Sequence, residues 1–175
     1  MIRKKKRYSR PKKAYEKTRI EEENLLLKKY ALKNKAEVWK TAAKVSYFRK
    51  RAMALARSSF EEQEILFSKL KALGLKTNVT ADVLALKIED LLERRLPTVV
   101  FKKNLAKTTQ EARQMVTHKR ILIDNRVVDS PSFLVSVEEE SNITLKKKAK
   151  QEPKIEVKSE EKVDEGVKEM AEVKA

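Results

Sequence analysis

Positive charge is concentrated at the N-terminal end of this 175-residue chain, and it divides the chain into parts with different prospects of folding. Residues 1–19 carry ten bases against one acid, residues 20–145 carry 23 bases and 17 acids, and residues 146–175 carry nine bases and eight acids. The positive charges of the first part repel one another. The last part has no aromatic residue whose burial could offset the conformational entropy lost on ordering. We therefore expect a basic arm at residues 1–18, a folded body at 19–145 and a disordered polar tail at 146–175.

The sequence contains two glycines, one histidine and no cysteine, which excludes several classes of protein. Disulfide frameworks, cysteine-ligated zinc, thiol nucleophiles and glycine-rich phosphate loops are all ruled out. No apolar run approaches the roughly 18 residues of a transmembrane span, and no apolar segment follows the basic stretch as in a secretory signal. We expect a soluble, cytoplasmic protein that is not an enzyme and has no cofactor, metal or small-molecule substrate. With a net charge of +16, its expected partner is a polyanion.

Residues 19–92 are predicted to form a helical N-terminal domain. Apolar residues recur at helical spacing over 19–34, 36–57 and 59–73, and a short helix is expected from Ala81. Ser59 and Thr80 are the candidate N-caps of the last two helices, and Gly74 stands where the helix over 59–73 is expected to end.

Residues 93–145 are predicted to form a small α/β domain. A helical pattern over 88–104 contains Pro97, so a break is expected near Leu96. A capping-box sequence begins at Thr108 and predicts a second helix. After His118 the pattern changes to short β-branched runs at 121–123, 127–128, 133–135 and 143–145, separated by turn-forming residues. The fold class is therefore α+β: helices followed by a small α/β domain of two helices and a short antiparallel sheet.

Two helices of this domain carry bases at helical intervals, with glutamines and a histidine between them. Arginine donates hydrogen bonds to phosphate in pairs, and glutamine and histidine add donors that reach 2′-hydroxyls and base edges. The candidate RNA contacts from the residues alone are Arg94, Arg95, Lys102, Lys103, Lys107, Gln110, Arg113, Gln114, His118, Lys119 and Arg120.

Aromatic residues bear on the mode of binding, because proteins that bind single strands stack bases on exposed rings. Most aromatic residues here fall in apolar patterns and are expected in the core, which favours recognition of folded RNA by shape and backbone. They are Trp39, Tyr47, Phe48, Phe60, Phe67, Phe101 and Phe133.

The segment from Glu93 to Val135 closely resembles the RNA-binding domain of the ribosomal protein S-four family. The matching words are Glu93-Arg94-Arg95-Leu96, Val99-Val100-Phe101, Leu105-Ala106, Gln110-Glu111-Ala112-Arg113-Gln114 and Pro131-Ser132-Phe133. Upstream, Arg19-Ile20-Glu21-Glu22-Glu23 and Lys29-Tyr30-Ala31-Leu32-Lys33-Asn34-Lys35 resemble the archaeal and eukaryotic type of this family.

This resemblance implies a structural constituent of the small ribosomal subunit. It implies a primary binder of small-subunit rRNA that nucleates assembly of the subunit body and contributes to translational accuracy, with the S-five and S-twelve proteins as neighbours. It adds Thr108 to the RNA contacts named above. Further phosphate contacts are expected from the basic arm and from the helix predicted over 36–57. They are Arg3, Lys4, Lys5, Lys6, Arg7, Arg10, Lys12, Lys13, Arg49, Lys50, Arg51 and Arg57.

The chain departs from the family pattern at three places. His118-Lys119-Arg120 stands where the family commonly has a His-Gly-His-like turn, and Pro97 replaces a usually polar residue. The strand turn reads Asp124-Asn125 rather than Asn-Gly, but Asn125 can adopt the left-handed conformation, so we expect the hairpin to form.

The alternative function is a free RNA-binding factor that acts in assembly or rescue of ribosomal subunits. An enzyme with this domain as an appendage is disfavoured, because residues 1–92 contain no catalytic constellation. A basic helix on anionic membranes is also disfavoured, because the arm lacks an apolar face.

Overall fold

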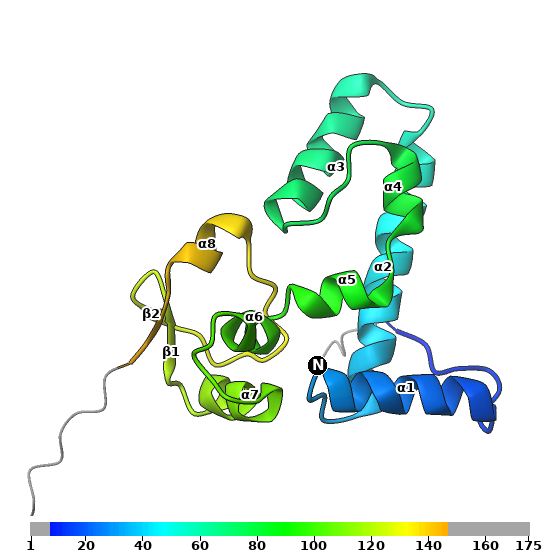
Figure 1. Ribbon diagram of the computed structural model, residues 1–175. Coiled ribbons are helices and arrows are strands. Elements are labelled where there is room, and N and C mark those ends of the chain that lie inside the picture. Colours follow the sequence, from blue (N-terminus) through cyan, green and yellow to red (C-terminus); the bar gives the residue numbers. More distant parts are fainter. Residues whose placement is uncertain (1–7, 147–175) are drawn as a thin grey trace, which may run out of the picture.

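The computed structural model describes residues 8–146 and confirms the α+β class (Figure 1). Residues 1–7, which include the predicted contacts Arg3, Lys4, Lys5, Lys6 and Arg7, and nearly all of the predicted tail lie outside the described residues. The elements in chain order are α1 (Lys17–Lys29), α2 (Lys35–Leu55), α3 (Phe60–Ala72), α4 (Thr80–Ala85), α5 (Ile88–Glu93), α6 (Leu96–Lys102), α7 (Thr109–Thr117), β1 (Ile121–Ile123), β2 (Arg126–Val127), α8 (Val137–Ser141) and β3 (Ile143–Leu145).

The long helix α2 organises the N-terminal half, and α1, α3, α4 and α5 all contact it (Figure 1). Its buried residues Val38, Val45 and Ala52 recur every seven positions, so one stripe faces the neighbouring helices along its length. Helix α1 ends five residues before the predicted limit of 34, because Ala31 adopts a positive φ of 49° and turns the chain toward α2.

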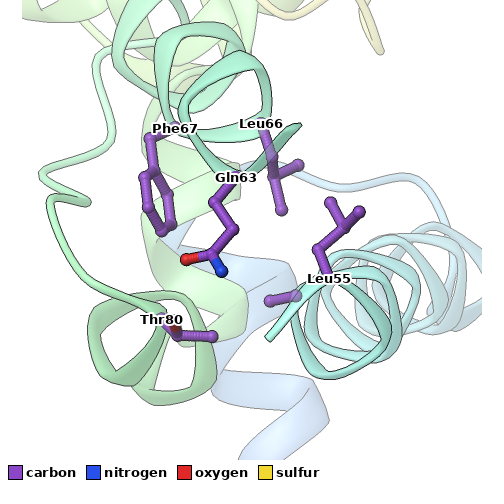
Figure 2. A pocket seen from close by; sticks show the side chains of 6 residues that line it. Leu55, Gln63, Leu66, Phe67 and Thr80 are labelled. Carbon is purple, nitrogen blue, oxygen red and sulfur yellow. The ribbon is translucent and has the colours of Figure 1, made fainter. Parts of the chain in front are cut away.

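Where α2 ends, α3 and α4 close over it around a small apolar hollow. Figure 2 shows Gln63, Leu66 and Phe67 extending from α3 toward Leu55 and Thr80. The amide of Gln63 is satisfied by the carbonyl of Ser58 at 3.2 Å. The hollow has no room for even a water molecule, so it is part of the packed core.

The break predicted at Pro97 is present and separates α5 from α6. Pro97 lies in the first turn of α6, where its missing N–H costs no helical hydrogen bond. The chain before it is extended, with the Leu96 N–H donating to the carbonyl of Phe133 at 2.9 Å and the Val135 N–H to that of Arg94 at 2.9 Å. These bonds explain why the run at 133–135, predicted as a strand, does not join the sheet.

The sheet has three antiparallel strands in the order β2-β1-β3. The hairpin between β1 and β2 forms as expected, because Asp124 and Asn125 have φ values of 49° and 63°, which a type I′ turn requires at both central positions. Helix α8 was not predicted. It begins at a capping box in which Ser136 and Glu139 bond each other's backbone N–H groups.

Two core clusters result, one in each half. The N-terminal cluster lies between α2, α3, α4 and α5, and the C-terminal cluster lies between α6, α7 and the sheet. Three aromatic residues predicted in the core are instead exposed: Tyr47 at 55%, Phe60 at 74% and Phe101 at 39%. Conversely, Glu23 on α1 is a buried acid. It accepts hydrogen bonds from Arg19 and Trp39.

Candidate nucleic-acid interface

Helix α7 presents a polar outer face because its two apolar residues face inward. Ala112 and Val116, four residues apart, are fully buried against α6 and the sheet. The hydroxyl of Thr108 accepts a hydrogen bond from the Glu111 N–H at 3.1 Å and fixes the start of the helix. Gln110 and Gln114 on this helix are exposed.

Four further predicted contacts are exposed at the ends of α7. They are Lys107 before the helix, and His118, Lys119 and Arg120 after it. Lys119 adopts a positive φ of 57°, at the position where the resembled family commonly has glycine. The chain therefore makes a left-handed turn here with a cation on it. Lys119 lies 3.9 Å from Asp129, but both side chains are more than half exposed, so this pair is weak. We call these four residues, together with Gln110 and Gln114, the α7 face.

Helix α6 contributes less to this face than the sequence suggests. Five of its seven residues, Leu96 to Val100, are buried. The bases around it have partners within the protein: Lys102 pairs with Glu93 at 2.9 Å, and the ammonium of Lys103 donates to the carbonyl of Glu140. Arg94 pairs with the carboxylate of Glu140 at 2.8 Å.

Arg95 and Arg113 converge on one carboxylate, that of Glu37 in the first turn of α2. Nη2 of Arg95 lies 2.8 Å from Oε2 of Glu37, and Nη2 of Arg113 lies 2.7 Å from Oε1. Arg113 also donates to the carbonyl of Ala31 at 3.2 Å, and Arg95 to that of Pro131 at 3.2 Å. We call this arrangement of Glu37, Arg95 and Arg113 the Glu37 clamp.

The attraction between Glu37 and the two arginines is strong because all three side chains are mostly buried. Burial alone raises the pKa of Glu37, but the hydrogen bonds and charges of Arg113 and Arg95 outweigh it and lower the pKa to about 2. The carboxylate is therefore ionised at every physiological pH. The clamp joins α2 of the N-terminal half to the start of α6 and to α7.

Sequence reasoning missed Glu37 as a functional residue. An acid in the first turn of a helix is ordinarily explained by the helix dipole, and nothing local distinguishes this one. Its partners lie 58 and 76 residues away in sequence.

The predicted contacts outside the C-terminal domain are mostly exposed. Arg10, Lys12, Lys13, Lys50, Arg51 and Arg57 are exposed, whereas Arg49 donates to the carbonyl of Leu86 at 2.6 Å. Figure 1 shows α2 running from α1 toward α3, so its bases from Arg49 onward lie at the α3 end. The clamp places α7 near the opposite end of α2, so the structure does not unite these bases with the α7 face.

Among residues 8–146, no helix is long and apolar enough to cross a bilayer. Over the same residues, no group of three or more histidine, aspartate or glutamate side chains is arranged to hold a metal ion.

Comparison with known proteins finds one match within the C-terminal domain and several that extend over most of the chain. The family model described as the S4 domain matches residues 94–141. The small ribosomal subunit protein uS4 of Picrophilus torridus is 45% identical over 148 residues, covering 79% of this chain and 81% of the relative. The proteins of that name from Methanothermobacter thermautotrophicus and Thermoplasma volcanium are 42% and 41% identical, covering 79% of this chain and 84% and 74% of the relatives.

Proposed function

The chain belongs to the family of small ribosomal subunit protein uS4, and we propose that it is a structural, non-enzymatic constituent of the small ribosomal subunit that binds its rRNA. The observation that carries this proposal is the coincidence of the S4-domain match at residues 94–141 with the exposed α7 face. Its location is the ribosome in the cytoplasm.

The finer roles follow from the family and are part of the proposal. The protein is a primary binder of small-subunit rRNA, nucleates assembly of the subunit body and contributes to translational accuracy beside the S-five and S-twelve proteins. The helical region at 19–92 and the RNA-binding domain at 93–145 act as one body on RNA. The arm at 1–18 adds phosphate contacts.

The structure supports a division of labour among the predicted contacts. The exposed residues of the α7 face are free to meet phosphates and 2′-hydroxyls. Three of the predicted contacts already have carboxylate partners: Arg94, Arg95 and Arg113. We therefore assign them a structural role, which is to stabilise the fold that positions the α7 face. Replacing Arg95 or Arg113 would leave Glu37 with one partner fewer and would destabilise the fold. A change in RNA affinity could then not be separated from the loss of stability.

The test of the RNA face therefore uses exposed bases only. In full-length protein, Lys107→Gln, Lys119→Gln and Arg120→Gln together should lower the slope of log affinity against log salt by about three, one for each lost phosphate contact. A matched variant removes three exposed bases around the end of α3, at Lys69, Lys71 and Lys76, and should bind small-subunit rRNA as tightly as wild type. Equal losses from both variants would contradict the assignment of the α7 face.

Sedimentation of cell lysate on a density gradient tests the role itself. Stoichiometric protein in small-subunit and whole-ribosome fractions after a moderate salt wash is the expected result. Substoichiometric protein confined to free or immature subunits would instead indicate an assembly or rescue factor.

A further inference from the structure

An open groove of about 1260 Å³ separates α2 from the C-terminal domain. One wall is the face of α2 from Glu37 to Phe48, which at 1.5 Å per residue is about 16 Å long. The opposite wall includes Arg95, Arg113 and the loop at 131–134, and the Glu37 clamp closes one end. The groove is thus continuous with the proposed RNA-binding domain.

The groove contains positive charge that the protein leaves without a counter-charge. Lys40 and Lys44 lie one helical turn apart on α2, and within residues 8–146 neither is within ion-pair distance of a carboxylate. Among the described residues, the one acid that lines the groove is Glu37, which both clamp arginines already engage. Burial lowers the pKa of Lys44, although the residue as a whole is exposed, and an anion beside its ammonium would favour the charged form. The charge of the groove therefore favours an anionic ligand.

The same wall of the groove also presents an aromatic ring to solvent. Tyr47 lies one turn beyond Lys44, and it is 55% exposed. The ring of Phe48 supports it from one side at a centroid distance of 5.8 Å, and Arg51 donates to its hydroxyl at 3.2 Å. An exposed aromatic ring beside lysines that have no carboxylate partner can hold an unstacked base and its phosphate.

We propose that this groove binds a single-stranded or bulged segment of RNA, with one base stacked on Tyr47 and an adjacent phosphate held by Lys40 and Lys44. The proposal rests on the proposed function, because the groove and the α7 face would bind the same rRNA. It adds a second mode of recognition, since a base within a duplex is not available to stack on a side chain. An acidic protein segment would satisfy the lysines but would leave the ring without a flat partner.

The experiment measures the affinity of full-length protein for small-subunit rRNA at several salt concentrations. Tyr47→Leu should weaken binding by about 5- to 150-fold with an unchanged salt slope, because stacking is lost and no phosphate contact is removed. Tyr47→Phe keeps the ring and should bind like wild type. Lys44→Gln should instead lower the salt slope by about one.

Phe60→Leu is the matched control, because Phe60 is an exposed aromatic residue outside the groove, and it should have no effect. Ultraviolet cross-linking gives an independent readout. In the wild-type complex, a nucleotide should be attached to the tryptic peptide at residues 45–49, which contains Tyr47.

The outcomes separate this inference from the function on which it rests. Tight binding by wild type and equally tight binding by Tyr47→Leu would overturn the groove proposal and leave the proposed function standing. Normal binding of Tyr47→Leu to naked rRNA with poor incorporation into subunits would place a neighbouring protein in the groove, which also overturns it. Failure of wild type to bind rRNA would overturn both.

Discussion

Among the described residues, the carboxylate of Glu37 makes the ion pairs that join the two halves of the molecule. Moving a carboxylate out of water is costly, and a buried one without partners would be protonated or would disrupt the fold. Here two arginines satisfy both of its oxygens, so its charge is retained and its geometry is fixed. Through these contacts the residue holds Arg95 and Arg113 in place beside the proposed RNA-binding surface.

Glu37→Gln tests this role through the pH dependence of stability. The folded pKa of about 2 lies below the ordinary value of 4.5, so the ionised form stabilises the fold above about pH 4.5, and this stabilisation is lost as the pH falls toward 2. At 1.36 kcal/mol per unit, the contribution at pH 7 is at most about 3 kcal/mol. Urea unfolding from pH 7 to pH 2.5 should show a steeper loss of stability for wild type than for Glu37→Gln.

Glu93→Gln provides the control for that measurement. Glu93 pairs with Lys102 at 2.9 Å, a distance close to those of the clamp, but both side chains are about half exposed. Such a pair contributes about 1 kcal/mol or less. If Glu93→Gln changed the acid profile as much as Glu37→Gln does, burial would not be the source of the clamp's strength.

At the scale of single elements, the starts of α3 and α7 look alike in sequence but differ in structure. Both follow a hydroxyl residue. The Thr108 hydroxyl accepts from the Glu111 N–H, whereas Ser59 makes no side-chain cap hydrogen bond. A cap residue stabilises a helix only when it satisfies one of the free N–H groups of the first turn. The two helices therefore make a matched pair for testing this contact.

Thr108→Ala should reduce the free energy of unfolding by about 0.5–2 kcal/mol, the usual cost of losing an N-cap. Ser59→Ala should cost measurably less, because no cap hydrogen bond is lost. Thermal unfolding monitored by circular dichroism compares them. A larger loss from Ser59→Ala than from Thr108→Ala would contradict the hydrogen bonding described here.

Several elements could be predicted because their causes are local. The break at Pro97, the helix start at Thr108, the end of α3 at Gly74 and the turn at Asp124-Asn125 each depend on backbone preferences of one or two residues. The run at 133–135 was mispredicted as a strand of the sheet because its backbone partners, Arg94 and Leu96, are nearly forty residues away.

At the scale of the whole molecule, a net charge of +16 should dominate the encounter with RNA. If the full chain neutralises about six to ten phosphates, its affinity for small-subunit rRNA should fall by about 10³- to 10⁵-fold between roughly 50 and 200 mM salt. Filter binding over a salt series measures this slope. An affinity that hardly changes with salt would mean that contacts other than ion pairs carry the interaction.

The sequence by itself determined the charge distribution, the helix boundaries set by proline, glycine and capping residues, and the likeness to an RNA-binding family. These properties depend on composition and on interactions between near neighbours. Only the tertiary structure decided which lysine and arginine side chains are left exposed. The exposure of each one depends on whether a carboxylate distant in sequence packs beside it. Arg113 and Lys119 are both cations near one short helix. Packing against α2 places Arg113 on Glu37 and leaves Lys119 exposed to solvent.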